Sequence, residues 1–187
     1  MMDSGGTAPD YKLHLALRAA RRKGDVETLL SGLKNSTEAP FAARFLAEIG
    51  SRDSAAAIAP LLSAESAHTR AAAVDALGTL QHVEALPQIL HLAETDPAAS
   101  VRAMAAIAAC KTADIALVRP MLLVLLHDTN WQPRRVAAQL LGRWGSNGDV
   151  PSIRTAQESE SWWRRGAYRD AIRKIRRRSK GSSEASG

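Results

Sequence analysis

The chain has 187 residues, of which 45% are hydrophobic and only 4% aromatic, and its formal net charge is +6. This length suffices for one domain with a sizeable core, and the scarcity of aromatic and β-branched runs favours an all-α chain over a β-sheet protein. The single cysteine excludes an internal disulfide. The polar start and the lack of a run of about 18 apolar residues predict a cytoplasmic protein with no secretion signal and no membrane span.

Two helices are predicted at the start of the helical region. The first covers about residues 10–23, where apolar residues recur at helical spacing and Gly24 can adopt the left-handed conformation that ends a helix. Asp25 is placed to cap a second helix through residue 33. We interpret this pair as a degenerate first repeat, as is common at the ends of repeat proteins.

Four clearer helical hairpins follow, each with a small residue near the end of its first helix and a proline 9 or 10 residues later. These pairs are Gly50 and Pro60, Gly78 and Pro87, Cys110 and Pro120, and Gly142 and Pro151. The first helices are predicted at about 40–49, 68–79, 100–110 and 132–143, and their partners at about 54–63, 83–93, 115–127 and 149–157. Proline is tolerated in a first turn but costs about 3 kcal/mol deeper inside, so Pro60 and Pro120 should delay or kink their helices.

Repeat spacings of 28 to 32 residues are typical of stacked helical hairpins. A further helix over about 162–178 has no partner and should cap the stack. The predicted solenoid therefore covers residues 10–178. Residues 1–9 and 179–187 are rich in glycine and polar residues, and we expect both segments to be disordered.

Arginine recurs 8 residues before three of the small residues, at Arg70, Arg102 and Arg134, and an acid lies six residues before two of these arginines, at Asp96 and Asp128. Glu158 with Arg164 and Glu65 with Arg70 fit this pattern more loosely. The pattern resembles HEAT repeats of the short kind found in the phycobilisome lyases, over about residues 40–178. The resemblance implies an all-α solenoid of about five HEAT-like helical hairpins plus a C-terminal capping helix. It also implies that the periodic acids and arginines bond neighbouring repeats.

The residues show no catalytic or metal-binding pattern. None of the histidines is spaced for zinc; they are His14, His68, His82, His91 and His127. Cys110 occupies the position that glycine fills in other repeats, which indicates a packing role. We therefore expect no catalytic residue, no metal, no cofactor and no enzymatic activity.

The charge is concentrated at the C-terminal end. Residues 161–180 hold nine Arg or Lys against one Asp, so the rest of the chain sums to −2. On a helix, Arg165, Arg169, Arg173 and Arg176 fall within an arc of about 80°. Arginines at i,i+4 repel each other, so this row favours an acidic partner over chance. The alternative is a solubilising end-cap whose positive charges suit the C-terminal end of a helix.

All four tryptophans, Trp131, Trp144, Trp162 and Trp163, have arginines nearby in the sequence. The alternative to binding is packing, with Trp144 in the core and Trp131 and Trp162 covering loop ends. Adjacent Trp162 and Trp163 cannot both point inward from a regular helix, so at least one should be exposed. Together with the basic row, these patterns give the candidate binding residues Trp131, Arg135, Arg143, Trp163, Arg165, Arg169, Arg173, Arg176 and Arg177.

The leading hypothesis is a non-catalytic scaffold that binds an acidic protein partner through its curved surface and basic C-terminal helix. The alternative is a nucleic-acid-binding solenoid that uses arginine on phosphates and tryptophan on bases. The resemblance also brings two remoter alternatives, a chromophore lyase subunit and an alkylpurine DNA glycosylase, with Asp128 as the nearest candidate for the catalytic carboxylate of the latter.

Overall fold

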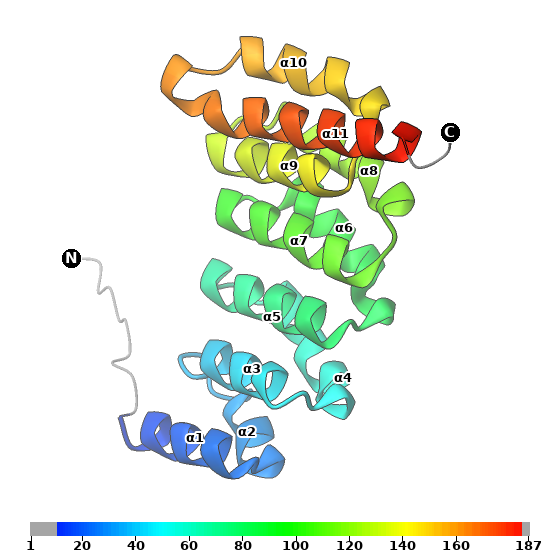
Figure 1. Ribbon diagram of the computed structural model, residues 1–187. Coiled ribbons are helices and arrows are strands. Elements are labelled where there is room, and N and C mark those ends of the chain that lie inside the picture. The colour runs from blue at the N-terminus through cyan, green and yellow to red at the C-terminus, as the bar shows by residue number, and fades with distance from the viewer. Residues whose placement is uncertain (1–10, 185–187) are drawn as a thin grey trace, which may run out of the picture. The chain divides into compact units, whose positions relative to one another are not determined.

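The computed structural model describes residues 11–184, with side chains as far as residue 181, and every regular element in this range is helical (Figure 1). The chain divides into two compact units, residues 1–85 and 86–187. The expected disorder of residues 1–9 lies outside the described range, as does that of residues 185–187.

The N-terminal unit is a stack of helices built around a leucine-rich core. Its α-helices are α1 (Tyr11–Lys23), α2 (Val26–Gly32), α3 (Ala39–Glu48), α4 (Ala55–Ile58) and α5 (Ala67–Leu80). Helix α3 packs against α1, α2 and α5. Leu17, Leu46 and Leu77 are fully buried, one from each of the three longer helices.

The turn after α1 follows the sequence prediction, and the turn after α3 has the same conformation. Gly24 has φ +69° and Gly50 has φ +72°, the left-handed conformation that favours glycine after a helix. Asp25 caps α2, with its carboxylate accepting a hydrogen bond from the Thr28 amide at 3.1 Å.

Pro60 divides the helix that was predicted over residues 54–63. The observed segment consists of a 3-10 turn, Arg52–Ser54, then the short α4, then a second 3-10 helix, Ala59–Ser63, with Pro60 in its first turn. Proline cannot donate the hydrogen bond that would continue α4, which explains the break.

The C-terminal unit contains two layers of helices. The first layer comprises α7 (Ala99–Thr112), α9 (Trp131–Trp144) and α11 (Gly166–Glu184), and the second comprises α6 (Leu86–Thr95), α8 (Ile115–Leu125) and α10 (Val150–Glu158). Helix α9 packs between α7 and α11, while α8 contacts α6, α7 and α9, and α10 contacts α11 (Figure 1). This stacking of hairpins on one another is the α-solenoid arrangement.

Small residues bring the first-layer helices close together. Ala105, Ala106 and Ala109 of α7 are fully buried. At Gly142 of α9, an added Cβ would lie 2.6 Å from the Cα of Ala171 in α11. The small residue near the end of α9 is therefore required by the approach of the next first-layer helix.

The structure differs from the sequence prediction at Pro120 and at both ends of the last helix, which was predicted over about 162–178 but begins at Gly166, after a 3-10 turn over Trp162–Arg164. Pro120 lies inside α8 but does not delay it, because the helix already begins at Ile115 with Asp114 as its cap. Helix α11 continues to Glu184, so residues 179–184, expected in a disordered tail, are helical. Within this extension, the Ser179 hydroxyl donates to the Ile175 carbonyl at 3.2 Å, one turn earlier.

Candidate binding surfaces of the C-terminal unit

Two arginines of the repeat pattern join successive hairpins. Arg102 of α7 donates through Nε and Nη2 to the two carboxylate oxygens of Asp128, both at 2.7 Å, and through Nη1 to the Asp96 carbonyl at 2.7 Å. Arg134 of α9 repeats this arrangement, with 3.0 and 2.8 Å bonds to Glu160 and a 2.9 Å bond to the Asp128 carbonyl. These arginines are thus engaged in holding the stack together.

The acids of these pairs have lowered pKa values. Burial alone would raise the pKa of Asp128, but hydrogen bonds from Arg102 and from the Asn130 amide outweigh it and hold the pKa below its ordinary value. The pKa of Glu160 is lowered in the same way, against the effect of burial, by Arg134 and the Ser161 amide. Both carboxylates are therefore bound as charged groups.

The acid of the last pair is Glu160 and not Glu158, the residue that the sequence pattern indicated. Glu160 is almost fully buried and also accepts a hydrogen bond from the Tyr168 hydroxyl at 3.3 Å, whereas Glu158 is exposed. A similar buried acid, Asp149, accepts hydrogen bonds from Nε of Arg119 at 2.5 Å and from the Ser146 amide at 2.7 Å. Glu160 continues the 32-residue step from Asp96 to Asp128, but sequence reasoning missed both acids because neither is followed by an arginine six residues later.

Three of the predicted binding arginines are engaged within the unit, and one of them, Arg173, donates to Asp170 on its own helix. Arg165 donates to the carbonyls of Glu160 at 2.9 Å and Glu158 at 3.1 Å, so it caps the end of α10. Arg143 stacks on Trp144, with its guanidinium 4.7 Å from the ring centre. Arg178 similarly donates to the carbonyls of Gly142 and Gly145, both at 2.6 Å. The predicted arginine row therefore begins at Arg169.

The rest of the row lines a cavity that we call the basic cleft, with a volume of about 600 Å³. Its lining comes from α10 and α11 and consists of Arg154, Gln157, Arg169, Ile172, Arg173, Arg176, Arg177 and Lys180. Six of these residues are basic and none is acidic. No sequence pattern indicated Arg154 as a binding residue, because it lies on α10, outside the basic C-terminal segment.

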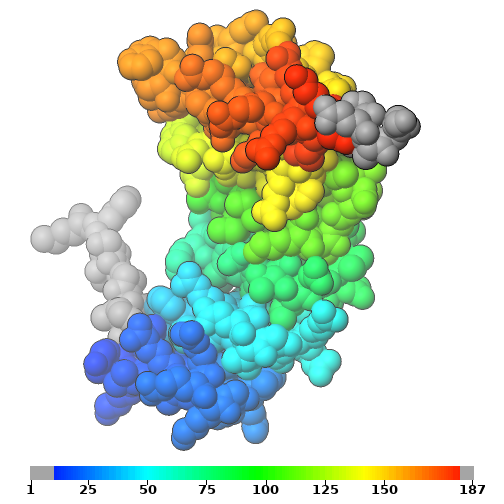
Figure 2. Space-filling model, in the orientation of Figure 1, coloured from blue at the N-terminus to red at the C-terminus, as the bar shows by residue number. Residues whose placement is uncertain are grey.

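The basic cleft continues along α10. A neighbouring hollow of about 580 Å³ shares Arg154 and Arg176 with it and adds Thr155 and Glu158. Figure 2 shows α10 and α11, coloured from orange to red, at the surface of the C-terminal unit. A ligand longer than one side chain can therefore extend from the cleft along both helices.

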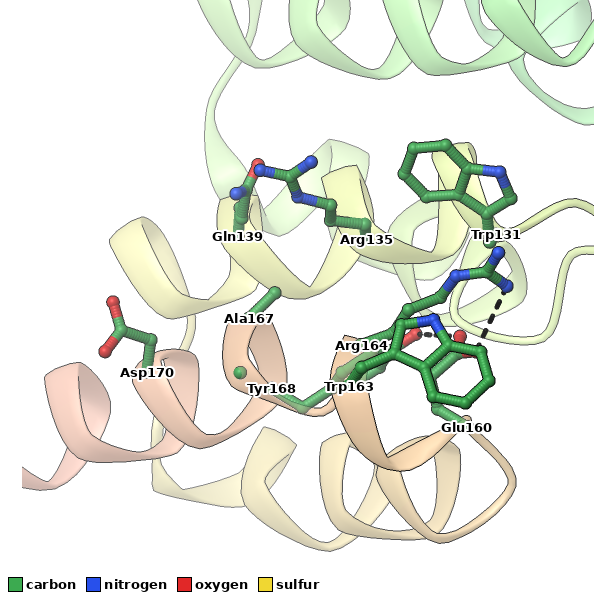
Figure 3. A pocket seen from close by; sticks show the side chains of 10 residues that line it. Trp131, Arg135, Gln139, Glu160, Trp163, Arg164, Ala167, Tyr168 and Asp170 are labelled. Carbon is green, nitrogen blue, oxygen red and sulfur yellow. Dashed lines mark hydrogen bonds and ion pairs between the residues drawn. The ribbon is translucent and has the colours of Figure 1, made fainter.

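The structure brings three other predicted residues together in a second cavity, the tryptophan pocket, of about 420 Å³ (Figure 3). They are Trp131, Arg135 and Trp163, joined by Glu160 and Arg164 in the lining. The Arg164 guanidinium lies 5.2 Å from the ring centre of Trp131, and its Nη1 lies 3.8 Å from the Glu160 carboxylate. The pocket thus combines aromatic faces with cationic groups.

Both adjacent tryptophans are exposed, Trp162 by 74% and Trp163 by 64%, and their rings meet edge to face at 5.7 Å. The prediction that at least one of them faces outward is confirmed. Exposed indoles of this size are common at binding surfaces.

The side chains that could take part in catalysis or bind a metal have surroundings that indicate a structural role. Burial raises the pKa of the Cys110 thiol to about 11, which disfavours the nucleophilic thiolate. His14 pairs with the fully buried Glu38 at 2.9 Å. Within the described residues, no three histidine, cysteine, aspartate or glutamate side chains are placed to hold a metal ion. Nor does any described helix combine the length and hydrophobicity that crossing a bilayer requires.

One family match and one structural match agree with this architecture. Residues 26–110 match the family model for HEAT repeats. The crystal structure of an engineered protein from the Northeast Structural Genomics Consortium aligns with 21% identity and a TM-score of 0.57, over 87% of this chain and 83% of that one. A chain from the complex of CpcE and CpcF of phycocyanin lyase from Nostoc sp. PCC7120 aligns with 16% identity and a TM-score of 0.43, over 90% and 91%. No curated protein sequence matches significantly. The chain therefore contains HEAT repeats, matched over residues 26–110, and is an all-α solenoid of HEAT-like helical hairpins.

Proposed function

We propose that this chain is a non-catalytic scaffold that binds an acidic protein partner through the basic cleft. HEAT repeats generally mediate protein–protein interactions, and a stack of helical hairpins offers a long surface for this purpose. The observation that carries the proposal is the lining of the cleft, with six basic side chains and no acidic one.

These basic side chains are distinct from the arginines that stabilise the fold. Four of the six make no side-chain hydrogen bond or ion pair within the described residues; they are Arg154, Arg169, Arg176 and Arg177. Helix α11 is docked by other residues, since Tyr168, Ala171 and Ile175 are each about 1% exposed. Like charges at i,i+4 destabilise a helix by a few tenths of a kcal/mol each, so the cluster is better explained by a ligand than by stability.

Fluorescence anisotropy with a labelled 20-residue glutamate-rich peptide tests the proposal. We expect salt-sensitive binding to the full chain, and we expect the double variant Arg169→Glu/Arg176→Glu to abolish it. The matched control is Arg18→Glu/Arg22→Glu, which makes the same change in net charge on exposed residues of α1. Absence of binding to the wild-type chain, or equal loss in both double variants, would contradict the proposal.

A second candidate function, single-stranded nucleic-acid binding, is favoured by the tryptophan pocket. Exposed aromatic rings beside arginines can stack on bases while the guanidinium groups contact phosphates. The candidate predicts that an oligonucleotide binds the chain at about 50 mM salt, that its affinity falls steeply with added salt, and that Trp163→Ala weakens it. A flat gel-shift titration at that salt concentration would exclude it.

The glycosylase alternative has less support. Both oxygens of Asp128 accept hydrogen bonds from Arg102, and one also accepts the Asn130 amide at 2.7 Å. The Asp128 carboxylate is therefore engaged in the contact between repeats and is not directed at a substrate.

A further inference from the structure

The basic cleft contains one apolar residue that a site for charge alone would not need. Ile172 of α11 lies half-buried in the lining, in the same turns of the helix as Arg169, Arg173 and Arg176. An isoleucine bordered by cations offers a partner both apolar contact and ionic contact. The occupant should therefore be amphipathic.

The position of the cleft indicates what form this occupant takes. In the C-terminal unit, α7 is followed by α8 and α9 by α10, and each of these following helices buries apolar side chains such as Leu122 and Ile153. Helix α11 is the next first-layer helix, and no helix follows it within the described residues. The cleft lies along α10 and α11 at this end of the unit.

We propose that the protein partner supplies an amphipathic α-helix that lies in the basic cleft, with apolar side chains on Ile172 and acidic side chains on the surrounding arginines. This inference rests on the proposed function and specifies the kind of segment that is bound. The docked helix would add a further element to the stack at α10 and α11.

The dimensions of the lining set the length of the bound helix. The residues of α11 that line the cleft run from Arg169 to Lys180. At 1.5 Å per residue this segment is about 16 Å long, so about three turns of a bound helix would contact it. Acidic residues at i,i+3 or i,i+4 on such a helix would face the cations of α11, because those cations recur at the same intervals.

Three other occupants fit the cleft less well. A polar cap that only protects the end of a stack would carry charges of both signs, whereas this lining has one sign. The first helix of a second copy would be repelled, because α1 contains Lys12, Arg18, Arg21, Arg22 and Lys23 and no acid. A single-stranded nucleic acid generally requires aromatic residues for stacking, and the basic cleft has none.

Two labelled 14-residue peptides of identical composition test the proposal on the full chain. In the first, leucines repeat every three or four residues among glutamates, which gives one apolar face; in the second, the same residues are permuted so that no face forms. We expect the first to bind at least ten-fold more tightly and to gain helical circular dichroism on binding. Ile172→Ser should reduce its affinity to that of the permuted peptide, whereas Arg169→Glu/Arg176→Glu should abolish binding of both.

The outcomes separate this inference from the proposed function. Equal binding of both peptides to the wild-type chain, with no gain of helix, would refute the proposal that the bound segment is an amphipathic helix. It would leave the proposed binding of an acidic partner unaffected. Binding of neither peptide would overturn both proposals, and binding of an oligonucleotide alone would support the nucleic-acid candidate instead. The comparison of the two peptides uses the wild-type chain, so it decides the question even if Ile172→Ser fails to fold.

Discussion

Replacing Arg102 with methionine would test whether the periodic arginines hold the stack together. The Arg102 side chain is 11% exposed and that of Asp128 is 7% exposed, so the change would leave a largely buried carboxylate without its cation. It would also remove the hydrogen bond to the Asp96 carbonyl. Breaking a buried pair from one side costs about 3–5 kcal/mol, compared with about 1 kcal/mol or less for an exposed pair.

Urea unfolding followed by tryptophan fluorescence provides the assay. All four tryptophans lie within residues 131–163, so the signal reports on the C-terminal unit. With a slope of about 1.5 kcal/mol/M, a loss of about 3–5 kcal/mol lowers the urea midpoint by about 2–3 M. The control, Arg135→Met, changes an exposed arginine of α9 and should alter the free energy of unfolding by about 0.5 kcal/mol or less.

A double-mutant cycle isolates the pair itself. Adding Asp128→Asn to Arg102→Met removes the uncompensated charge, so the double variant should be less destabilised than the sum of the two single variants. A loss below about 1 kcal/mol for Arg102→Met, or strict additivity in the cycle, would refute the structural role assigned to this arginine.

Three further predictions concern packing, pH and the thiol. Gly142→Ala should destabilise the C-terminal unit by about 1–3 kcal/mol because its Cβ would meet the α11 backbone, whereas Gly166→Ala, with nothing within 4 Å, should not; equal thermal midpoints would contradict this. The lowered pKa values of Asp128 and Glu160 contribute stability that is present above the unfolded-state pKa values, near pH 4, and is lost as the pH falls through the folded-state values. The urea midpoint of unfolding should therefore not change with pH near neutrality and should fall in acid. The fall should be smaller in the Glu160→Gln variant. Cys110, with its pKa of about 11, should react with iodoacetamide at pH 8 about 10–100 times more slowly in the folded chain than in the urea-unfolded chain; equal rates would show that the thiol is accessible and unperturbed.

Local sequence signals were sufficient to predict the first helices of the four clearer hairpins. Their observed ends, in α3, α5, α7 and α9, lie within two residues of the predicted ones. Each prediction rested on apolar periodicity and on a small residue near the helix end, and both are local properties. The partner helix around Pro60 was less predictable, because whether a proline splits a helix or lies inside it, as Pro120 does, depends on packing.

The candidate site depends on contacts that periodicity does not encode. Arg165 and Arg169 have equivalent positions in the predicted row, yet Arg165 is directed to the carbonyls at the end of α10. Arg154 reaches the basic cleft only because α10 packs against α11. The sequence therefore predicted the basic surface and its tryptophans, while tertiary contacts determine which arginines are available to a partner.

The pairing of Arg102 with Asp128 and of Arg134 with Glu160 also bears on how such a chain can change in length. Each arginine meets an acid 26 residues later, and the two pairs are offset by 32 residues, the length of one hairpin. A duplicated segment of that length would contain one arginine and one acid of the series. Its acid could pair with the arginine of the preceding hairpin, and its arginine with the acid of the following one. An insertion of another length would leave a buried charge without its partner, at a cost of about 3–5 kcal/mol. Growth and shortening by whole hairpins are therefore the changes that this ionic register permits.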